Sequence, residues 1–144
     1  PMDVNDLYGT WKILYDKNVI YGVVQRIDDV TVTTHKDDWE NDNLEVFFDL
    51  DGTFAQLRTI VGKEWANHPL QGNRKAVWSQ DGKVLEFLVE LPADDVTGRT
   101  IGWNIALSDN DQGPDSTRKY QLYPIYGFND SWQGKNLCEL KFTE

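Results

Sequence analysis

Two tryptophans occupy segments of this sequence that are otherwise polar. Trp39 stands in the run Lys36–Asp42, and Trp132 stands in the run Asn129–Gly134. An indole in such a loop exposes apolar area to water unless it folds back on the core or contacts a ligand. Trp65, in a third loop, is a weaker example of the same pattern. The other three tryptophans lie inside strand-like patterns, where we expect them to pack: Trp11, Trp78 and Trp103.

A second group of chemically capable residues lies on one predicted hairpin. Asp51-Gly52 is typical of a two-residue hairpin turn, which pairs residues whose numbers sum to about 103. Glu45 then faces Arg58, and Phe47 faces Gln56, on one side of the hairpin. The opposite side is apolar and is expected to face the core: Leu44, Val46, Phe48, Leu50, Ala55 and Leu57.

Two interpretations of this polar hairpin face are open. It could be a solvated sheet surface, on which a cross-strand ion pair contributes roughly 0.2–1 kcal/mol. Alternatively, it could be part of a sugar site. Flat aromatic rings stack on the apolar C–H faces of sugars, while carboxylate, amide and guanidinium groups bind the hydroxyls. Trp39 and Trp132 could supply the rings, and Glu45, Gln56 and Arg58 the polar groups.

Aspartate-rich loops point to calcium more than to catalysis. Asp28-Asp29 and Asp37-Asp38 stand near the ends of predicted strands, and Asp109–Gly113 resembles the start of a calcium loop. That loop lacks the third acidic position and the distal Glu of a helix-loop-helix site. Several such loops at one end of a sandwich could still surround a hard cation. Acidic clusters that serve only solubility are the alternative.

Composition and missing motifs exclude other functions. The chain has 144 residues with a formal charge of -10, which disfavours nucleic acid and anionic membranes as partners. Its single Cys excludes an internal disulfide framework, and no apolar run approaches the ~20 residues of a membrane span. Phosphate loops, strand-elbow serines and zinc-protease helices are absent. A glycosidase-like pair among the 24 acids remains open.

The elements that must position these residues are strands. Apolar and polar residues alternate in five short segments, four more segments are candidate strands, and turn signals separate the nine. They are 11–15, 19–24, 44–50, 54–61, 76–79, 85–91, 101–107, 119–126 and 138–142. This pattern predicts an all-β, jelly-roll-like antiparallel β-sandwich of about eight to ten strands, formed as a single domain over residues 1–144. Loops 31–42 and 64–74 are long enough to carry binding residues.

Five segments, in order, resemble family-nine carbohydrate-binding modules. Asp38–Asp49 is similar to the family's signature strand, a Trp-Glu-x-Asp-x-hydrophobic-Glu-hydrophobic-Phe run before an Asp. Ala55–Arg58 resembles the next strand, with its Gln and Arg. Later segments also match: 89–92 with 101–109, 129–132 and 137–142. Residues 11–28 resemble the family's early strands.

The resemblance implies a non-catalytic β-sandwich that binds cellulose- or xylan-type chains or chain ends between two tryptophans. The positions that match are Trp39 and Trp132 for stacking, and Glu45, Arg58, Asn129 and the weaker Gln56 for polar contacts. It also implies structural calcium, with Asp28 and Asp109 among the matching acids. We expect a secreted monomer whose signal segment is not part of this sequence. Its partners would be polysaccharide or oligosaccharide and a glycoside hydrolase, and neither nucleic acid nor membrane.

Two other functions compete with this one. Gly9-Thr10-Trp11 resembles the opening of lipocalin-like barrels, which hold small apolar ligands. A barrel interior should be apolar, however, whereas the predicted hairpin face pairs Glu45 with Arg58. The third possibility is an enzyme with weak activity on glycosides. Titrating the protein with an oligosaccharide and with a fatty acid or retinoid distinguishes a sugar-binding module from a lipocalin-like barrel. A reducing-sugar assay tests for the enzyme.

Overall fold

The computed structural model describes residues 7–115, 120–124, 134 and 137–144. Nine strands follow one another in these residues: β1 Leu7–Asp16, β2 Val19–Asp28, β3 Asn43–Leu50, β4 Thr53–Ile60, β5 Arg74–Trp78, β6 Val84–Glu90, β7 Thr100–Asp109, β8 Tyr120–Pro124 and β9 Cys138–Lys141. One 3-10 helix, η1, spans Asp38–Glu40. No helix in the described segments is long and apolar enough to cross a membrane.

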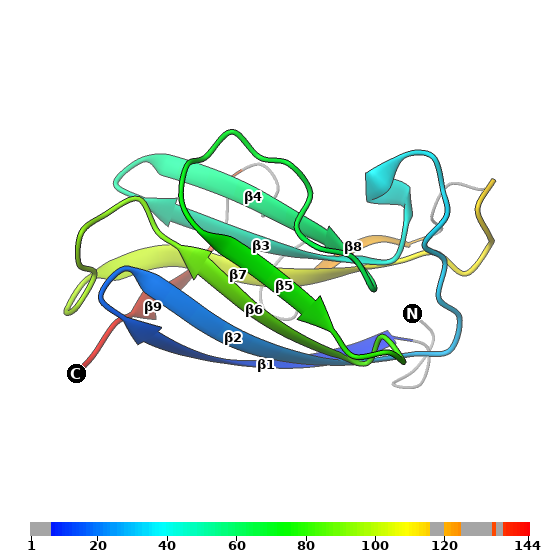
Figure 1. The fold of residues 1–144 in the computed structure, drawn as a ribbon, viewed down its shortest axis with the longest axis horizontal. Helices are drawn as coiled ribbons and strands as arrows, with labels where there is room; N and C mark the ends of the chain where they lie inside the picture. The colour runs from blue at the N-terminus through cyan, green and yellow to red at the C-terminus, as the bar shows by residue number, and fades with distance from the viewer. Residues whose placement is uncertain (1–6, 116–119, 125–133, 135–136) are drawn as a thin grey trace.

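The strands form two antiparallel sheets that face each other (Figure 1). One sheet has the order β1-β2-β6-β5, and the other has the order β4-β3-β7-β8. β9 also pairs with β7, along Thr100–Trp103, while β8 pairs with residues 106–109 of the same strand. Two separate sheets make a sandwich, so the predicted fold class is confirmed and the lipocalin-like barrel is wrong.

The core lies between the sheets because each strand turns alternate side chains inward. Ile20, Val24 and Leu85 come from one sheet, and Leu44, Val46 and Ile105 from the other; all are at most 1% exposed. Gly22 makes room for the ring of Phe87, its paired neighbour on β6 in the same sheet. A Cβ at this position would come within 2.2 Å of Cζ of Phe87, so only glycine fits over that ring.

The β3–β4 hairpin has the predicted register. Leu50 pairs with Thr53 across the two-residue turn, where Asp51 has φ 52° and Gly52 has φ 82°. Positive φ at both central residues is typical of the type I′ turn, whose twist suits a hairpin. Glu45 therefore pairs with Arg58, and Phe47 with Gln56. Their neighbours Leu44, Val46, Phe48, Leu50, Ala55 and Leu57 are all buried, as predicted.

Candidate functional site

The face of the β3–β4 hairpin that points away from the core carries a linked polar group. Both the Nε and the Nη2 atoms of Arg58 contact Oε1 of Glu45, at 2.7 Å and 2.6 Å. The side-chain amide of Gln56 donates to the other oxygen, Oε2, at 3.0 Å. One carboxylate thus orients a guanidinium and an amide that lie side by side on β4. Charge-assisted contacts of this kind are stronger than neutral hydrogen bonds.

This face is covered rather than solvated, which overturns the interpretation of it as an open sheet surface. Glu45 is 2% exposed, and Phe47 is completely buried. Phe54 stacks on Phe47 with ring centroids 6.4 Å apart, and Leu137 packs against the same cluster. Gly134 lies over the Phe54 ring, since a Cβ there would be 3.4 Å from it. The chain's C-terminal region therefore returns across the sheet.

Burial divides the three polar residues into two roles. The Arg58 side chain keeps 22% of its surface exposed, whereas that of Glu45 keeps 2%. Gln56 is also partly exposed. A ligand can therefore reach the guanidinium and the amide from solvent, while both oxygens of the carboxylate already hold these two groups. Glu45 is placed to orient the donors of Arg58 and Gln56 more than to contact a ligand itself.

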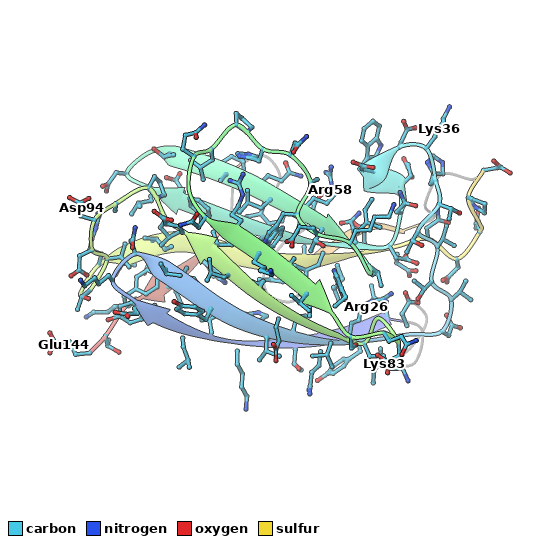
Figure 2. The ribbon with its side chains drawn as sticks, viewed as in Figure 1. Arg26, Lys36, Arg58, Lys83, Asp94 and Glu144 are labelled. Carbon is cyan, nitrogen blue, oxygen red and sulfur yellow. The ribbon has the colours of Figure 1, made fainter. Side chains whose placement is uncertain are left out.

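Trp39 lies at the same end of the hairpin. It is the middle residue of η1, and the chain reaches Asn43, the first residue of β3, four residues later. Asn43 pairs with Ile60, two residues beyond Arg58 on β4. Four extended residues span at most about 14 Å, which limits the distance between the Trp39 and Asn43 backbones. Figures 1 and 2 show η1 and Arg58 near this end of the sandwich.

Exposure separates Trp39 from the other tryptophans that the structure describes. Its side chain is 48% exposed. Trp65, the third loop tryptophan, folds back on the core and meets the Phe87 ring edge-on at 5.9 Å. Trp11, Trp78 and Trp103 pack in or against the core, as predicted. Trp132 and Asn129, the remaining predicted site residues, lie outside the described residues.

The two acids predicted to bind calcium come together, with a third beside them. Carboxylate oxygens of Asp28, Asp42 and Asp109 all lie within 4.8 Å of one another. Asp28 ends β2, Asp109 ends β7, and Asp42 directly precedes β3. Asp42 is not among the metal ligands predicted from the sequence. The only signal for it is its position in the polar run Asn41-Asp42-Asn43, directly before a buried strand.

An arginine borders this acid group. Arg26 is 4% exposed and pairs with Asp28, whose side chain is 1% exposed. The carboxylates of Asp42 and Asp109 attract the same guanidinium. Burial raises the pKa of Asp42 to about 6, although hydrogen bonds from the backbone of Val32 and Asn110 oppose the shift. The three carboxylates and one guanidinium leave two negative charges, which a single divalent cation would balance.

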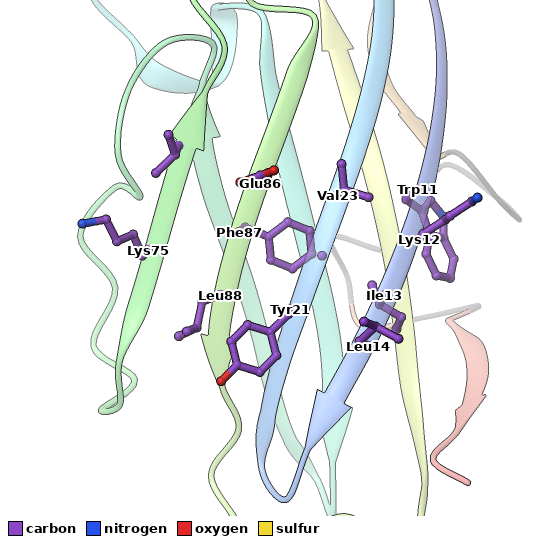
Figure 3. A pocket seen from close by; sticks show the side chains of 12 residues that line it. Trp11, Lys12, Ile13, Leu14, Tyr21, Val23, Lys75, Glu86, Phe87 and Leu88 are labelled. Atoms are coloured by element: carbon purple, nitrogen blue, oxygen red, sulfur yellow. The ribbon is translucent and has the colours of Figure 1, made fainter. Parts of the chain in front are cut away.

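A large apolar groove belongs to the other sheet. It has a volume of about 840 Å³ and lies over the outward face of β1, β2, β5 and β6 (Figure 3). Leu14, Tyr21 and Leu88 form a row across three strands, and Lys75 extends it onto β5. Leu14 is 78% exposed and Tyr21 46%. Among the predicted site residues that the structure describes, none lines this groove.

Comparison with known proteins supports the sequence resemblance. Residues 1–59 match the family model described as carbohydrate family 9 binding domain-like. A family 9 carbohydrate-binding module from Caldicellulosiruptor kristjanssonii, solved with cellotriose, has a TM-score of 0.79 at 17% identity, with 99% of this chain and 78% of that chain covered. The resemblance to family 9 modules is therefore confirmed.

A second structure agrees with the first. The C. kristjanssonii family 9 module solved with glucose has a TM-score of 0.76 at 17% identity, and the match covers 99% of this chain and 80% of that chain. Among curated proteins, none matches the chain. The family and both structures are carbohydrate-binding modules, which are non-catalytic, and this agrees with the prediction that the chain is not an enzyme.

Proposed function

We propose that this chain is a non-catalytic carbohydrate-binding module for cellulose- or xylan-type β-glycans. The observation that carries the proposal is Trp39, an exposed indole at the same end of the hairpin as the Arg58 and Gln56 donors. An exposed ring can stack on the C–H face of a sugar, and fixed donors can bind its hydroxyls. The similar C. kristjanssonii modules were solved with cellotriose and glucose, which supports a sugar of this class.

The second ring and one further polar contact come from the resemblance alone. Trp132 would stack on the opposite side of the sugar from Trp39, and Asn129 would bind a hydroxyl. Two rings around one sugar favour a chain end, because an internal unit would have to continue through the enclosed site. We also expect a secreted monomer that works beside a glycoside hydrolase. This expectation, too, rests on the resemblance alone.

Calorimetric titration with cellotriose, xylotriose and a fatty acid of similar size tests the ligand class. We expect the protein to bind at least one of the two trisaccharides and not the fatty acid. Reduction of the oligosaccharide's end to an alditol then tests chain-end binding, because the reduced unit has lost its ring. Binding of neither trisaccharide, together with no retention on insoluble cellulose or xylan, would contradict the proposal.

A structural calcium ion is a second part of the proposal. The Asp28, Asp42 and Asp109 oxygens all lie within 4.8 Å of one another, close enough to share one ion. Carboxylate oxygens are the ligands that calcium prefers. The three carboxylates and Arg26 together carry two negative charges, which a divalent ion would balance. An ion held there would tie together the ends of β2 and β7 and the start of β3.

Thermal unfolding in calcium and in chelator tests this site. We expect a higher Tm in calcium, because an ion that binds only the folded state stabilises it. Asp109→Asn should remove the difference between the two conditions. Asp94→Asn is the matched control, since Asp94 is exposed and lies at the opposite end of the sandwich from Arg26 (Figure 2). Equal Tm values for the wild-type protein in calcium and in chelator would contradict the site.

A further inference from the structure

The segment that connects Trp39 to β3 is unusually polar for its burial. Asn41, Asp42 and Asn43 follow one another and are each at most 1% exposed. Burying an amide or a carboxylate without hydrogen bonds costs several kcal/mol, by order of magnitude, so such groups are retained with partners. Here the partners of Asn41 belong to the loop that carries Trp39.

The buried side chain of Asn41 makes hydrogen bonds to the backbone of that loop. Its side-chain oxygen accepts from the backbone N–H of His35 at 2.7 Å. Its side-chain NH₂ donates to the carbonyl of His35 at 3.1 Å and to that of Asp37 at 3.3 Å. The three contacts use the oxygen and the NH₂ of one side chain, and they bring residues on the N-terminal side of Trp39 against the start of β3.

Asn110 holds the C-terminal side of Trp39 from a distant part of the chain. Its side-chain NH₂ donates to the carbonyl of Glu40 at 2.7 Å, although the two residues are 70 positions apart. Its backbone N–H donates to Asp42 at 2.7 Å, and its side-chain oxygen accepts from the N–H of Gln112 at 3.0 Å. Asn110 is completely buried. The turn is thereby attached to the end of β7.

The turn has few hydrogen bonds of its own. Within η1 the N–H of Glu40 donates to the carbonyl of Asp37 at 3.0 Å, and that of Asn41 donates to the carbonyl of Asp38 at 3.3 Å. Asp37, at the N-cap, makes no side-chain cap hydrogen bond. An isolated 3-10 turn of this length is not stable in water, because nucleating a helical turn is unfavourable. The contacts of the two asparagines therefore help to hold the turn in place.

We propose that Asn41 and Asn110 are positioning residues that fix the Trp39 indole at the sugar site before the ligand binds. The inference rests on the proposed function, since it assigns these residues to the same site. Neither side chain needs to touch the sugar. Holding the turn in place removes the ordering cost that the ligand would otherwise meet on binding, which raises affinity without a new contact.

Two readouts test this role: calorimetry with whichever of cellotriose or xylotriose the wild-type protein binds better, and ¹⁹F NMR of protein containing 5-fluorotryptophan. Trp39→Phe assigns the Trp39 resonance. Asn41→Ala and Asn110→Ala should each weaken binding about five- to tenfold, the size expected for lost hydrogen bonds, with a less favourable binding entropy. The Trp39 resonance should shift or broaden in the ligand-free variants, whereas a purely global role would move the Tm alone.

Asn73→Ala is the matched control, because Asn73 is an exposed asparagine in another loop. It should leave both the affinity and the Trp39 resonance unchanged. If an alanine variant fails to fold, Asn110→Asp replaces it. That change keeps an acceptor for the N–H of Gln112 but removes the donor to the Glu40 carbonyl.

The outcomes separate this inference from the proposed function. Suppose that the wild-type protein binds the saccharide, and that both asparagine variants keep its affinity and its Trp39 resonance. That result overturns the positioning role and leaves the proposed function standing. Absence of any saccharide binding by the wild-type protein overturns the function. The ¹⁹F resonance of the ligand-free variants then decides the positioning of Trp39 by itself, since a shifted resonance supports it and an unchanged one overturns it.

Discussion

The two sheets turn opposite kinds of surface outward. The β1-β2-β6-β5 sheet exposes an apolar groove in which Leu14 and Val77 are 78% and 52% exposed. The outward face of the β3–β4 hairpin is polar, yet Glu45 is 2% exposed and linked to Arg58 and Gln56. One face is thus apolar and open, and the other is charged and largely covered.

This difference favours the outward face of the β3–β4 hairpin for the proposed sugar site. Apolar side chains on an open sheet can bury area against many partners, because apolar contact has no directional requirement. A buried carboxylate loses its hydration, and the attraction to its partner can be smaller than the free energy lost in this way. The same carboxylate fixes the direction of two donors that a ligand can reach. Directed donors at the same end of the hairpin as an exposed indole suit a sugar better than an open apolar groove does.

The largest contrast between the faces is expected for two glutamates. Glu45→Ala should lower the free energy of unfolding by about 3 kcal/mol, because it leaves Arg58 and Gln56 without their shared acceptor. The partial exposure of Arg58 moderates that loss. Glu86→Ala on the open face should change stability by less than about 0.5 kcal/mol. Denaturant unfolding measures both changes in the free energy of unfolding. Equal losses for the two variants would show that the contacts of Glu45 with Arg58 and Gln56 add no stability beyond that of a surface glutamate.

Two aromatic residues give the next contrast. Trp39→Ala should weaken cello- or xylo-oligosaccharide binding by about 2 kcal/mol, from the apolar contact that the ring buries against the sugar. Its Tm should stay close to that of the wild-type protein, because the indole is 48% exposed. Tyr21→Ala removes a ring of similar exposure from the open face and should not alter the affinity. Calorimetry that found the reverse order would move the site to the groove.

The same two faces show what the sequence can and cannot predict. Alternation and turn signals located all nine strands, since a half-buried strand repeats with period two. The Asp51-Gly52 turn gave the register of β3 with β4, because its backbone conformation dictates the pairing. Apolar inward faces followed from that register. Local patterns are sufficient for these features, because each depends on residues close together in the chain.

The covering of the polar face could not be predicted in the same way. It depends on Gly134 and Leu137, some 90 positions from Glu45 in the chain, returning across β3 and β4. Asp42 was missed for a related reason: its neighbours Asp28 and Asp109 come from other strand ends. Trp39 was identified because an indole among charges is conspicuous. Its anchor Asn110 stands in the Asp109–Gly113 run, which indicated calcium and gave no sign of a contact with the Trp39 loop.

A smaller effect is expected from changing the shape of a cation while keeping its charge. Arg58→Lys retains a positive charge beside Glu45 but loses the planar group that presents several donors in fixed directions. We expect oligosaccharide binding to weaken by about 1 kcal/mol, since one or two directed hydrogen bonds are lost. Lys12→Ala, on the open face, is the control and should bind normally. Full affinity in Arg58→Lys would mean that charge alone, rather than donor geometry, serves the sugar.

The smallest effect is expected where most apolar surface is open to solvent. Leu14→Ser combined with Val77→Thr makes the groove more polar without touching the β3–β4 hairpin. Because both side chains are mostly in water, stability should change by less than about 0.5 kcal/mol and oligosaccharide affinity should not change. Calorimetry and denaturant unfolding of the double variant measure the two quantities. A tenfold loss of affinity would place sugar on the open face, and the covered polar face would then be a structural feature of the sandwich.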